Sequence, residues 1–99
     1  MPREPLSNAY AVCSAHASKP GKYAGQDPKS FIGKHVKLSF PAKNRGKATT
    51  EHMWVLVERL HKTKGLQGTI NNDPVLECAF KDGDTVAFGV HEIEDVYVP

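Results

Sequence analysis

Apolar and polar residues alternate in the first clearly patterned segment of the chain, HVKLSF, residues 35–40. Successive side chains of a β-strand point to opposite faces, so this period of two predicts a half-buried strand. Proline is poorly tolerated inside a sheet, and we expect Pro41 to end the strand. Residues 42–50 contain no apolar side chain larger than alanine and are expected to form an exposed loop.

A second strand is predicted in EHMWVLVERLHK, residues 51–62, which is apolar on both of its faces. That pattern favours a central strand. Met53, Val55 and Val57 share one face and are expected to enter the core. The other face carries Trp54, the only tryptophan of the chain. The pattern alone leaves open whether this ring is covered or exposed to a partner.

Shorter apolar segments follow, and residues typical of turns separate them. The segments are residues 66–70, 75–80, 85–90 and 91–99, with turns expected at HKTKG (61–65), at NNDP (71–74) and at KDGD (81–84). Five or six short strands predict a mainly β fold, either a small curved antiparallel sheet or an SH3-like barrel. An α+β fold is the alternative.

The first 30 residues differ from the rest, because they are polar and interrupted by four prolines. We expect them to form an N-terminal arm, in which residues 8–19 are a short helix or an irregular coil, before a β domain at residues 31–99. The arm has no apolar stretch typical of a secretory signal, and no run approaches the roughly 18–20 residues of a membrane span. A cytoplasmic location without membrane contact is therefore expected.

Charge is divided unevenly along the chain. Residues 1–50 carry nine Lys and Arg and two Asp and Glu, a net charge of +7. Residues 51–99 carry four Lys and Arg and nine Asp and Glu, a net charge of −5, so that the whole chain has a net charge of +2. Such a division has two interpretations: the basic half binds an anionic partner, or the two halves attract each other within the fold.

Catalytic and metal chemistry find little support. The five histidines and two cysteines lack the close spacing of a metal site, and no phosphate-binding or nucleophile motif is present. Cys13 is a formal nucleophile without supporting residues, Cys78 is expected to be a small core residue, and the pair Glu51-His52 has no third partner. We therefore expect no catalytic residue, no metal and no cofactor.

Two groups of residues are candidates for binding. The basic segment KNRGK suits an anion, because Arg and Lys pair well with phosphate, although a solvated hairpin tip is the simpler explanation. The predicted anion- or nucleic-acid-binding residues are Lys34, Lys37, Lys43, Arg45 and Lys47. The predicted partner-binding residues are His52, Trp54, Asn71, Asn72 and Asp73, although the last three are also ordinary turn residues.

Several spaced residues resemble the pattern of a known family. They are Glu51, His52, Trp54 and Val55, then Gly68, Ile70, Asn72 and Pro74, then Gly83, Asp84 and Val86, and finally Ile93 and Asp95. This set is similar to the YegJ-like bacterial domain of unknown function, related to an element of KfrB-type plasmid proteins, over about residues 31–97. The chain departs at Val96, where that pattern has an aromatic residue, with Tyr97 one place later. The resemblance bears on fold and implies no activity.

Together these features predict a non-catalytic binding module. A protein-binding accessory or inhibitor of bacterial, plasmid or phage origin is the leading hypothesis, because the charge division and the two-sided Trp54 strand suit an interface. Binding of nucleic acid through the basic half, or of a small phosphorylated ligand, remains the alternative. Nothing in the pattern indicates an oligomeric state.

Overall fold

The computed structural model describes residues 22–99. The possible helix at residues 8–19, Cys13 and most of the expected arm lie outside this range. The elements in chain order are the 3-10 turn η2 (Pro28–Phe31), β1 (His35–Asn44), β2 (Lys47–His61), β3 (Gly65–Ile70), β4 (Glu77–Cys78), β5 (Thr85–Phe88), the 3-10 turn η3 (Val90–Glu92) and β6 (Asp95–Val96). Within residues 22–99, no helix is long and apolar enough to cross a membrane.

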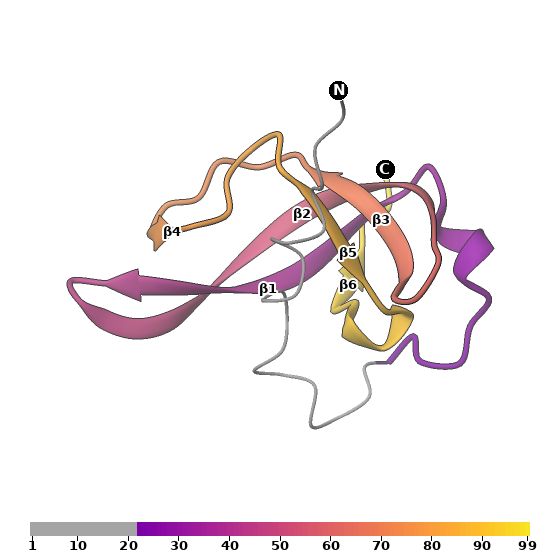
Figure 1. Ribbon diagram of the computed structural model, residues 1–99, viewed down its shortest axis with the longest axis horizontal. Helices are drawn as coiled ribbons and strands as arrows, with labels where there is room; N and C mark the ends of the chain where they lie inside the picture. The colour runs from indigo at the N-terminus through magenta and orange to yellow at the C-terminus, as the bar shows by residue number, and fades with distance from the viewer. Residues whose placement is uncertain (1–21) are drawn as a thin grey trace.

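All six strands belong to one antiparallel sheet that curls into a half-barrel (Figure 1). The strand order is β4-β1-β2-β3-β5, and β6 pairs with the opposite end of β1 from β4, so that two short strands share one edge. The prediction of a mainly β, curved antiparallel sheet is confirmed. The long strands β1 and β2 form the centre of the sheet, and their connected ends project as a hairpin beyond the other strands (Figure 1).

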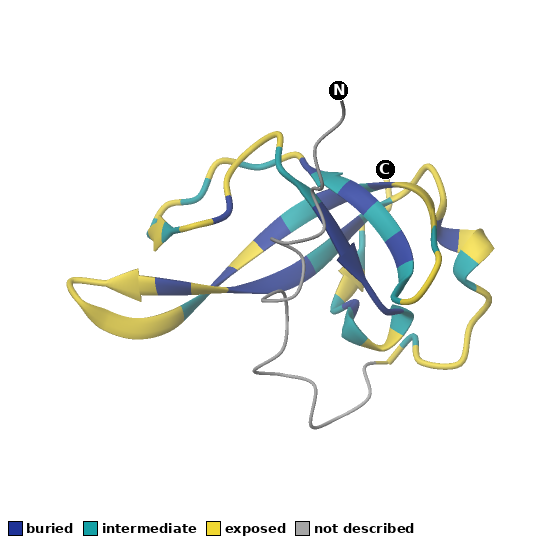
Figure 2. Ribbon diagram, viewed as in Figure 1, coloured by how far each residue is buried: buried dark blue, intermediate teal, exposed yellow. Residues whose placement is uncertain are grey.

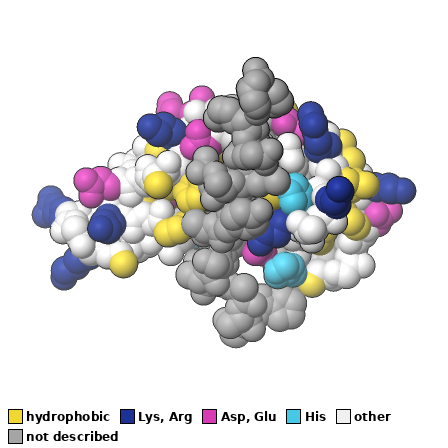
Figure 3. Space-filling model, in the orientation of Figure 1, with side chains coloured by type: hydrophobic (Ala, Val, Ile, Leu, Met, Phe, Trp, Pro, Cys, Tyr) yellow, Lys and Arg dark blue, Asp and Glu magenta, His cyan; other side chains and the backbone are white. Residues whose placement is uncertain are grey.

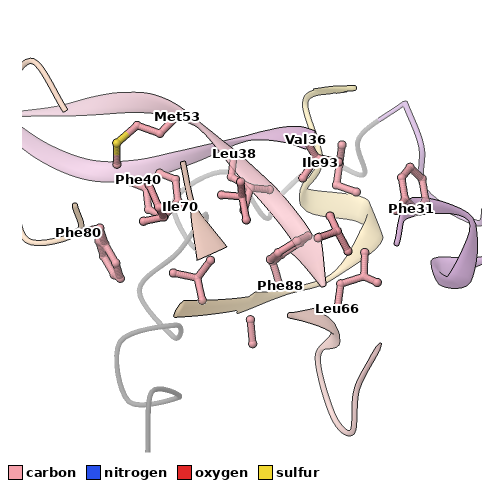
Figure 4. Close-up of a cluster of buried hydrophobic side chains, with 14 residues drawn as sticks. Phe31, Val36, Leu38, Phe40, Met53, Leu66, Ile70, Phe80, Phe88 and Ile93 are labelled. Carbon is pink, nitrogen blue, oxygen red and sulfur yellow. The ribbon is translucent and has the colours of Figure 1, made fainter. Parts of the chain in front are cut away.

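The core lies on the concave side of the sheet, where the alternating apolar residues of the long strands converge (Figures 2 and 4). Met53, Val55 and Val57 are almost completely buried, as predicted. Phe40 and Phe80 pack with ring centroids 5.2 Å apart and close the end of the core near β4. Removal of this apolar surface from water is the main term that stabilises the sheet.

Gly68 is required where β2 and β3 approach each other most closely. The register between these strands shifts between Val57 and Arg59, which marks a β-bulge opposite this glycine. A Cβ at position 68 would lie 2.2 Å from the backbone oxygen of Leu56, which is far inside van der Waals contact. The bulge therefore depends on a residue without a side chain.

The expectation that Pro41 ends the first strand is wrong. β1 continues to Asn44, and most of the expected loop at residues 42–50 is strand. The odd-numbered residues of β1 direct their backbone groups away from β2, as the bond from the Tyr97 amide to the His35 oxygen shows. The missing amide hydrogen of Pro41 therefore costs the β1–β2 ladder nothing.

The two-residue turn Arg45-Gly46 joins these strands, with φ of 53° and 83°. Positive φ at both central positions is the geometry that suits the twist of a tight hairpin.

Candidate binding site

The convex face of β1 and β2 carries a row of facing side chains. Lys37 lies opposite Trp54, and Ser39 lies opposite His52, one step further along the same two strands. These residues alternate with core residues, so the period-two pattern of the sequence directs them outwards. On the Trp54 side of β2, Trp54 and Leu56 are half-buried and His52 is exposed, whereas the residues of the opposite side are buried from Glu51 to Val57.

Tyr97, which follows β6, brings a second aromatic ring to this face. Its amide donates to the backbone oxygen of His35 at 2.9 Å, which fixes the C-terminal segment beside β1. The Tyr97 ring meets Trp54 edge to face at 5.9 Å between centroids and contacts His35 in a similar way at 6.5 Å. The Lys37 ammonium lies 5.0 Å from the centre of the Trp54 ring, in cation–π contact.

A pocket of about 240 Å³ opens among His35, Trp54, Asn71 and Tyr97. We call these four residues together with Lys37 the aromatic face. Edge-to-face ring packing holds its walls, and Tyr97 remains 56% exposed. Large rings that keep exposed surface in a concave site are the groups that carry most energy in binding interfaces.

The loop after β3 fastens onto β2 beside this pocket. The Asn71 amide donates to the Trp54 oxygen at 2.9 Å, and the Trp54 amide donates to Asn72 Oδ1 at 3.0 Å. Asn71 Nδ2 lies 3.1 Å from His35 Nε2 and donates to it. Asn72 also donates from its backbone to Asp82. Asn71 therefore lines the pocket, whereas the side chain of Asn72 supports the loop, and Asp73 is exposed without lining the pocket.

Glu51 secures the same loop from the concave side. It is 8% exposed, and its two carboxylate oxygens accept hydrogen bonds from the amides of Val75 (3.2 Å) and Leu76 (2.9 Å). A buried carboxylate with both oxygens bonded is satisfied. Its sequence neighbour His52 lies on the opposite face of β2, so the two do not form a pair.

His52 instead joins Ser39 and Glu94 in a cluster next to the aromatic face. Glu94 Oε1 lies 2.8 Å from His52 Nδ1, Ser39 Oγ lies 3.3 Å from the same nitrogen, and Ser39 donates to Glu94 Oε2. In an acyl-transfer triad the hydroxyl and the carboxylate contact opposite nitrogens of the ring. Here both approach Nδ1, and Ser39 is 1% exposed. The cluster ties the segment before β6 to the sheet.

Comparison with known proteins adds one finding. A bacterial family described as an uncharacterized protein conserved in bacteria, DUF2314, matches residues 29–98. The chain belongs to this family. No curated protein and no solved structure matched the chain. The DUF2314 region runs from η2 past Tyr97, so it contains the whole aromatic face.

The five predicted anion-binding residues do not form one patch in this DUF2314 domain. Lys43, Arg45 and Lys47 surround the hairpin tip, are exposed, and make no ion pair with any of residues 22–99. Figure 3 shows Lys and Arg side chains at that end of the molecule. Lys37 lies six residues back along β1, roughly 20 Å at the usual rise of a strand. Lys34 precedes β1 and is exposed.

A shallow apolar groove of about 820 Å³ runs between the hairpin and β4 of the DUF2314 domain. Its lining residues are Pro41, Ala42, Lys43, Ala48, Leu76, Glu77, Cys78 and Ala79. Cys78 is half-buried, not fully buried as expected, and its thiol donates to the Pro41 oxygen at 3.4 Å. Burial raises the pKa of this thiol, and the nearby carboxylates of Glu51 and Asp84 add to the rise.

The predicted partner-binding set named Trp54 and Asn71 but omitted His35 and Tyr97, which complete the pocket. His35 shares a face with Lys37 by strand parity, a signal that was available in the alternation. The position of Tyr97 depends on the pairing of β6 with β1, which joins segments far apart in the DUF2314 sequence. Glu94 was likewise omitted, and its contact with His52 depends on the same pairing.

Proposed function

We propose that this DUF2314 protein is a non-catalytic protein-binding module whose contact surface is the aromatic face. The observation that carries the proposal is the pocket between Trp54 and Tyr97, which is concave, aromatic and open at the surface. Tryptophan and tyrosine are enriched among the residues that dominate protein interfaces, because each buries a large rigid surface at low entropic cost.

The absence of a catalytic role is part of the same proposal. In the Ser39–His52–Glu94 cluster, the hydroxyl and the carboxylate both approach Nδ1 of the ring. A catalytic triad instead places them on opposite ring nitrogens, so that the ring can take a proton from the nucleophile. The Glu51 carboxylate, which also contacts the loop, accepts hydrogen bonds from two backbone amides. These residues are better explained as supports that hold the edges of the aromatic face in position.

Affinity capture from the bacterium that encodes the protein tests the proposal. The tagged wild-type chain should recover one protein in stoichiometric amount, and Trp54→Ala should lose it while remaining folded. Leu60→Ala is the matched control, because Leu60 is an exposed apolar residue of the same strand, 44% exposed, outside the pocket. Equal recovery by all three proteins would refute the proposed surface.

Nucleic-acid binding is the second candidate, favoured by the hairpin tip with Lys43, Arg45 and Lys47. A two-stranded ribbon that projects from a domain suits a nucleic-acid groove. Cations that make no ion pair within residues 22–99 suit phosphates. A mobility-shift assay with double-stranded DNA should then show binding that weakens steeply with salt. Replacement of all three cations by alanine should abolish that shift, and unchanged binding would exclude the tip.

A narrower relationship within bacterial proteins is also part of the proposal. A relation to the YegJ-like domain and the KfrB-type element rests on the motif residues around Trp54 and Asn72. Within that setting, we propose an accessory or inhibitory role towards a larger bacterial, plasmid or phage protein, in the cytoplasm. The basis is the size of the module and the open aromatic pocket between Trp54 and Tyr97.

A further inference from the structure

The two carboxylates beside the aromatic face each contact a basic side chain. Glu94 pairs with His52 at 2.8 Å, and Asp95 pairs with Lys22 at 3.7 Å. Lys37 lies between these groups, opposite Asp95 in the strand register, yet makes no ion pair with any of residues 22–99. Its ammonium is held over the Trp54 ring at the edge of the pocket. Among residues 22–99, Lys37 is therefore a positive charge without an ion pair, and it lies beside an apolar cavity.

The pocket also offers hydrogen-bonding groups. Asn71 uses one amide hydrogen on His35 Nε2, and its Oδ1 accepts no hydrogen bond from residues 22–99. At about 240 Å³, the cavity is smaller than the roughly 300–1,000 Å³ of pockets for drug-sized ligands. Its size and its aromatic walls suit a single apolar side chain.

We infer that the aromatic face, as the contact surface of the proposed function, binds a short acidic peptide segment of the partner protein. One aromatic or large aliphatic side chain of that segment enters the pocket between Trp54 and Tyr97. A carboxylate one or two residues away pairs with Lys37, and a peptide amide donates to Asn71 Oδ1. The peptide thus supplies an apolar side chain for the pocket, a negative charge for Lys37 and a backbone amide for Asn71.

A nucleic acid fits this surface less well. Single-stranded nucleic acid requires a groove with several cations along its backbone as well as stacking rings. Here the carboxylates of Glu94 and Asp95 flank Lys37, Lys22 contacts Asp95, and the basic group Lys43, Arg45 and Lys47 lies six or more residues further along the hairpin. Repeated phosphates would meet these carboxylates, whereas one carboxylate can meet Lys37 alone.

Selection of a random peptide library displayed on phage, with the full chain immobilised, tests the inference. The wild-type chain should enrich peptides that combine an aromatic or large aliphatic residue with Asp or Glu within two positions. Trp54→Ala should not enrich them. A synthetic selected peptide should bind Lys37→Glu about tenfold more weakly, since charge reversal turns a surface attraction into repulsion. Lys62→Glu, at an exposed turn position, is the matched control and should bind within about twofold of wild type.

Three outcomes would overturn the inference. The first is enrichment that does not depend on Trp54, and the second is equal affinity for Lys37→Glu and wild type. The third is displacement of the peptide by a single-stranded oligothymidine with steep salt dependence, which would assign the face to nucleic acid. The proposed function is tested separately by affinity capture. If a partner protein is captured only when Trp54 is present, but no Trp54-dependent peptide is enriched, the protein-binding function is supported and the acidic-peptide inference is refuted.

Discussion

Glu51 provides the sharpest test of how the binding loop is held. Its buried carboxylate is the only group that accepts hydrogen bonds from both the Val75 and the Leu76 amides among residues 22–99. Glu51→Ala removes both acceptors at once. Glu51→Gln keeps one acceptor oxygen but directs an amide group, itself a donor, at the other backbone donor.

The size of the effect follows from the two bonds. A hydrogen bond to a charged group contributes about 1.5–3 kcal/mol, and an unsatisfied buried donor costs a similar amount. Residue 75 is 89% exposed, so water can replace part of its bond, whereas residue 76 is half-buried. We therefore expect Glu51→Ala to lower the free energy of unfolding by about 3 kcal/mol and Glu51→Gln by roughly half of that. For a domain of this size, 3 kcal/mol corresponds to a fall in Tm of roughly 12–24 °C.

Urea denaturation followed by circular dichroism measures this loss, and amide hydrogen exchange at residues 75 and 76 locates it. Glu58→Ala is the matched control, because Glu58 lies on the same strand but is exposed and, among residues 22–99, accepts a hydrogen bond only from the Thr69 hydroxyl, at 3.0 Å. Its effect should stay within about 0.5 kcal/mol. The reasoning is refuted if Glu51→Ala unfolds at the same urea concentration as Glu58→Ala.

Three further predictions concern other parts of the fold. Gly68→Ala should lower the free energy of unfolding by about 3 kcal/mol or more, since its Cβ would lie 2.2 Å from the Leu56 backbone oxygen; a thermal melt close to wild type would contradict this. Lys37→Glu should reduce quenching of Trp54 fluorescence by iodide but not by neutral acrylamide, because the ammonium 5.0 Å from the ring attracts the anion; equal changes for both quenchers would exclude this contact. The pKa of the Cys78 thiol is raised in the folded state. The contribution of the protonated thiol to the free energy of unfolding is therefore complete below the ordinary thiol pKa, and it is lost as the pH rises through the folded-state pKa. Cys78→Ser, in a background without the other cysteine, should weaken this alkaline loss in urea titrations, and an unchanged pH profile would count against it.

The long strands were predictable because their alternation has a physical cause. One face of β1 and β2 is buried, and a shift of the strand register by one residue would turn all the apolar side chains of that face towards solvent. The hairpin beyond Pro41 was missed, because residues 42–50 bury almost nothing and give no hydrophobic signal. Their strand geometry comes instead from the ladder that the Arg45-Gly46 turn starts.

The site was predictable only in part, for a related reason. Trp54 stood out by residue type and by its outward parity in a two-sided strand. Tyr97 and Glu94 join the face through the pairing of β6, a strand of two residues that no local pattern specifies. Asn71 and Asn72 are adjacent and chemically identical, yet one faces the pocket and the other bonds the Trp54 amide. Residue type alone does not separate those two roles.

Photo-crosslinking in the bacterium that encodes the protein tests the central claim most directly. Tyr97→benzoylphenylalanine places a photoreactive ring at the 56%-exposed rim of the pocket, and Leu60→benzoylphenylalanine places the same group elsewhere on the surface. We predict that light links position 97, but not position 60, to one protein partner, and that Trp54→Ala removes the product. No product from position 97, or the same product from both positions, would contradict a binding function for the aromatic face.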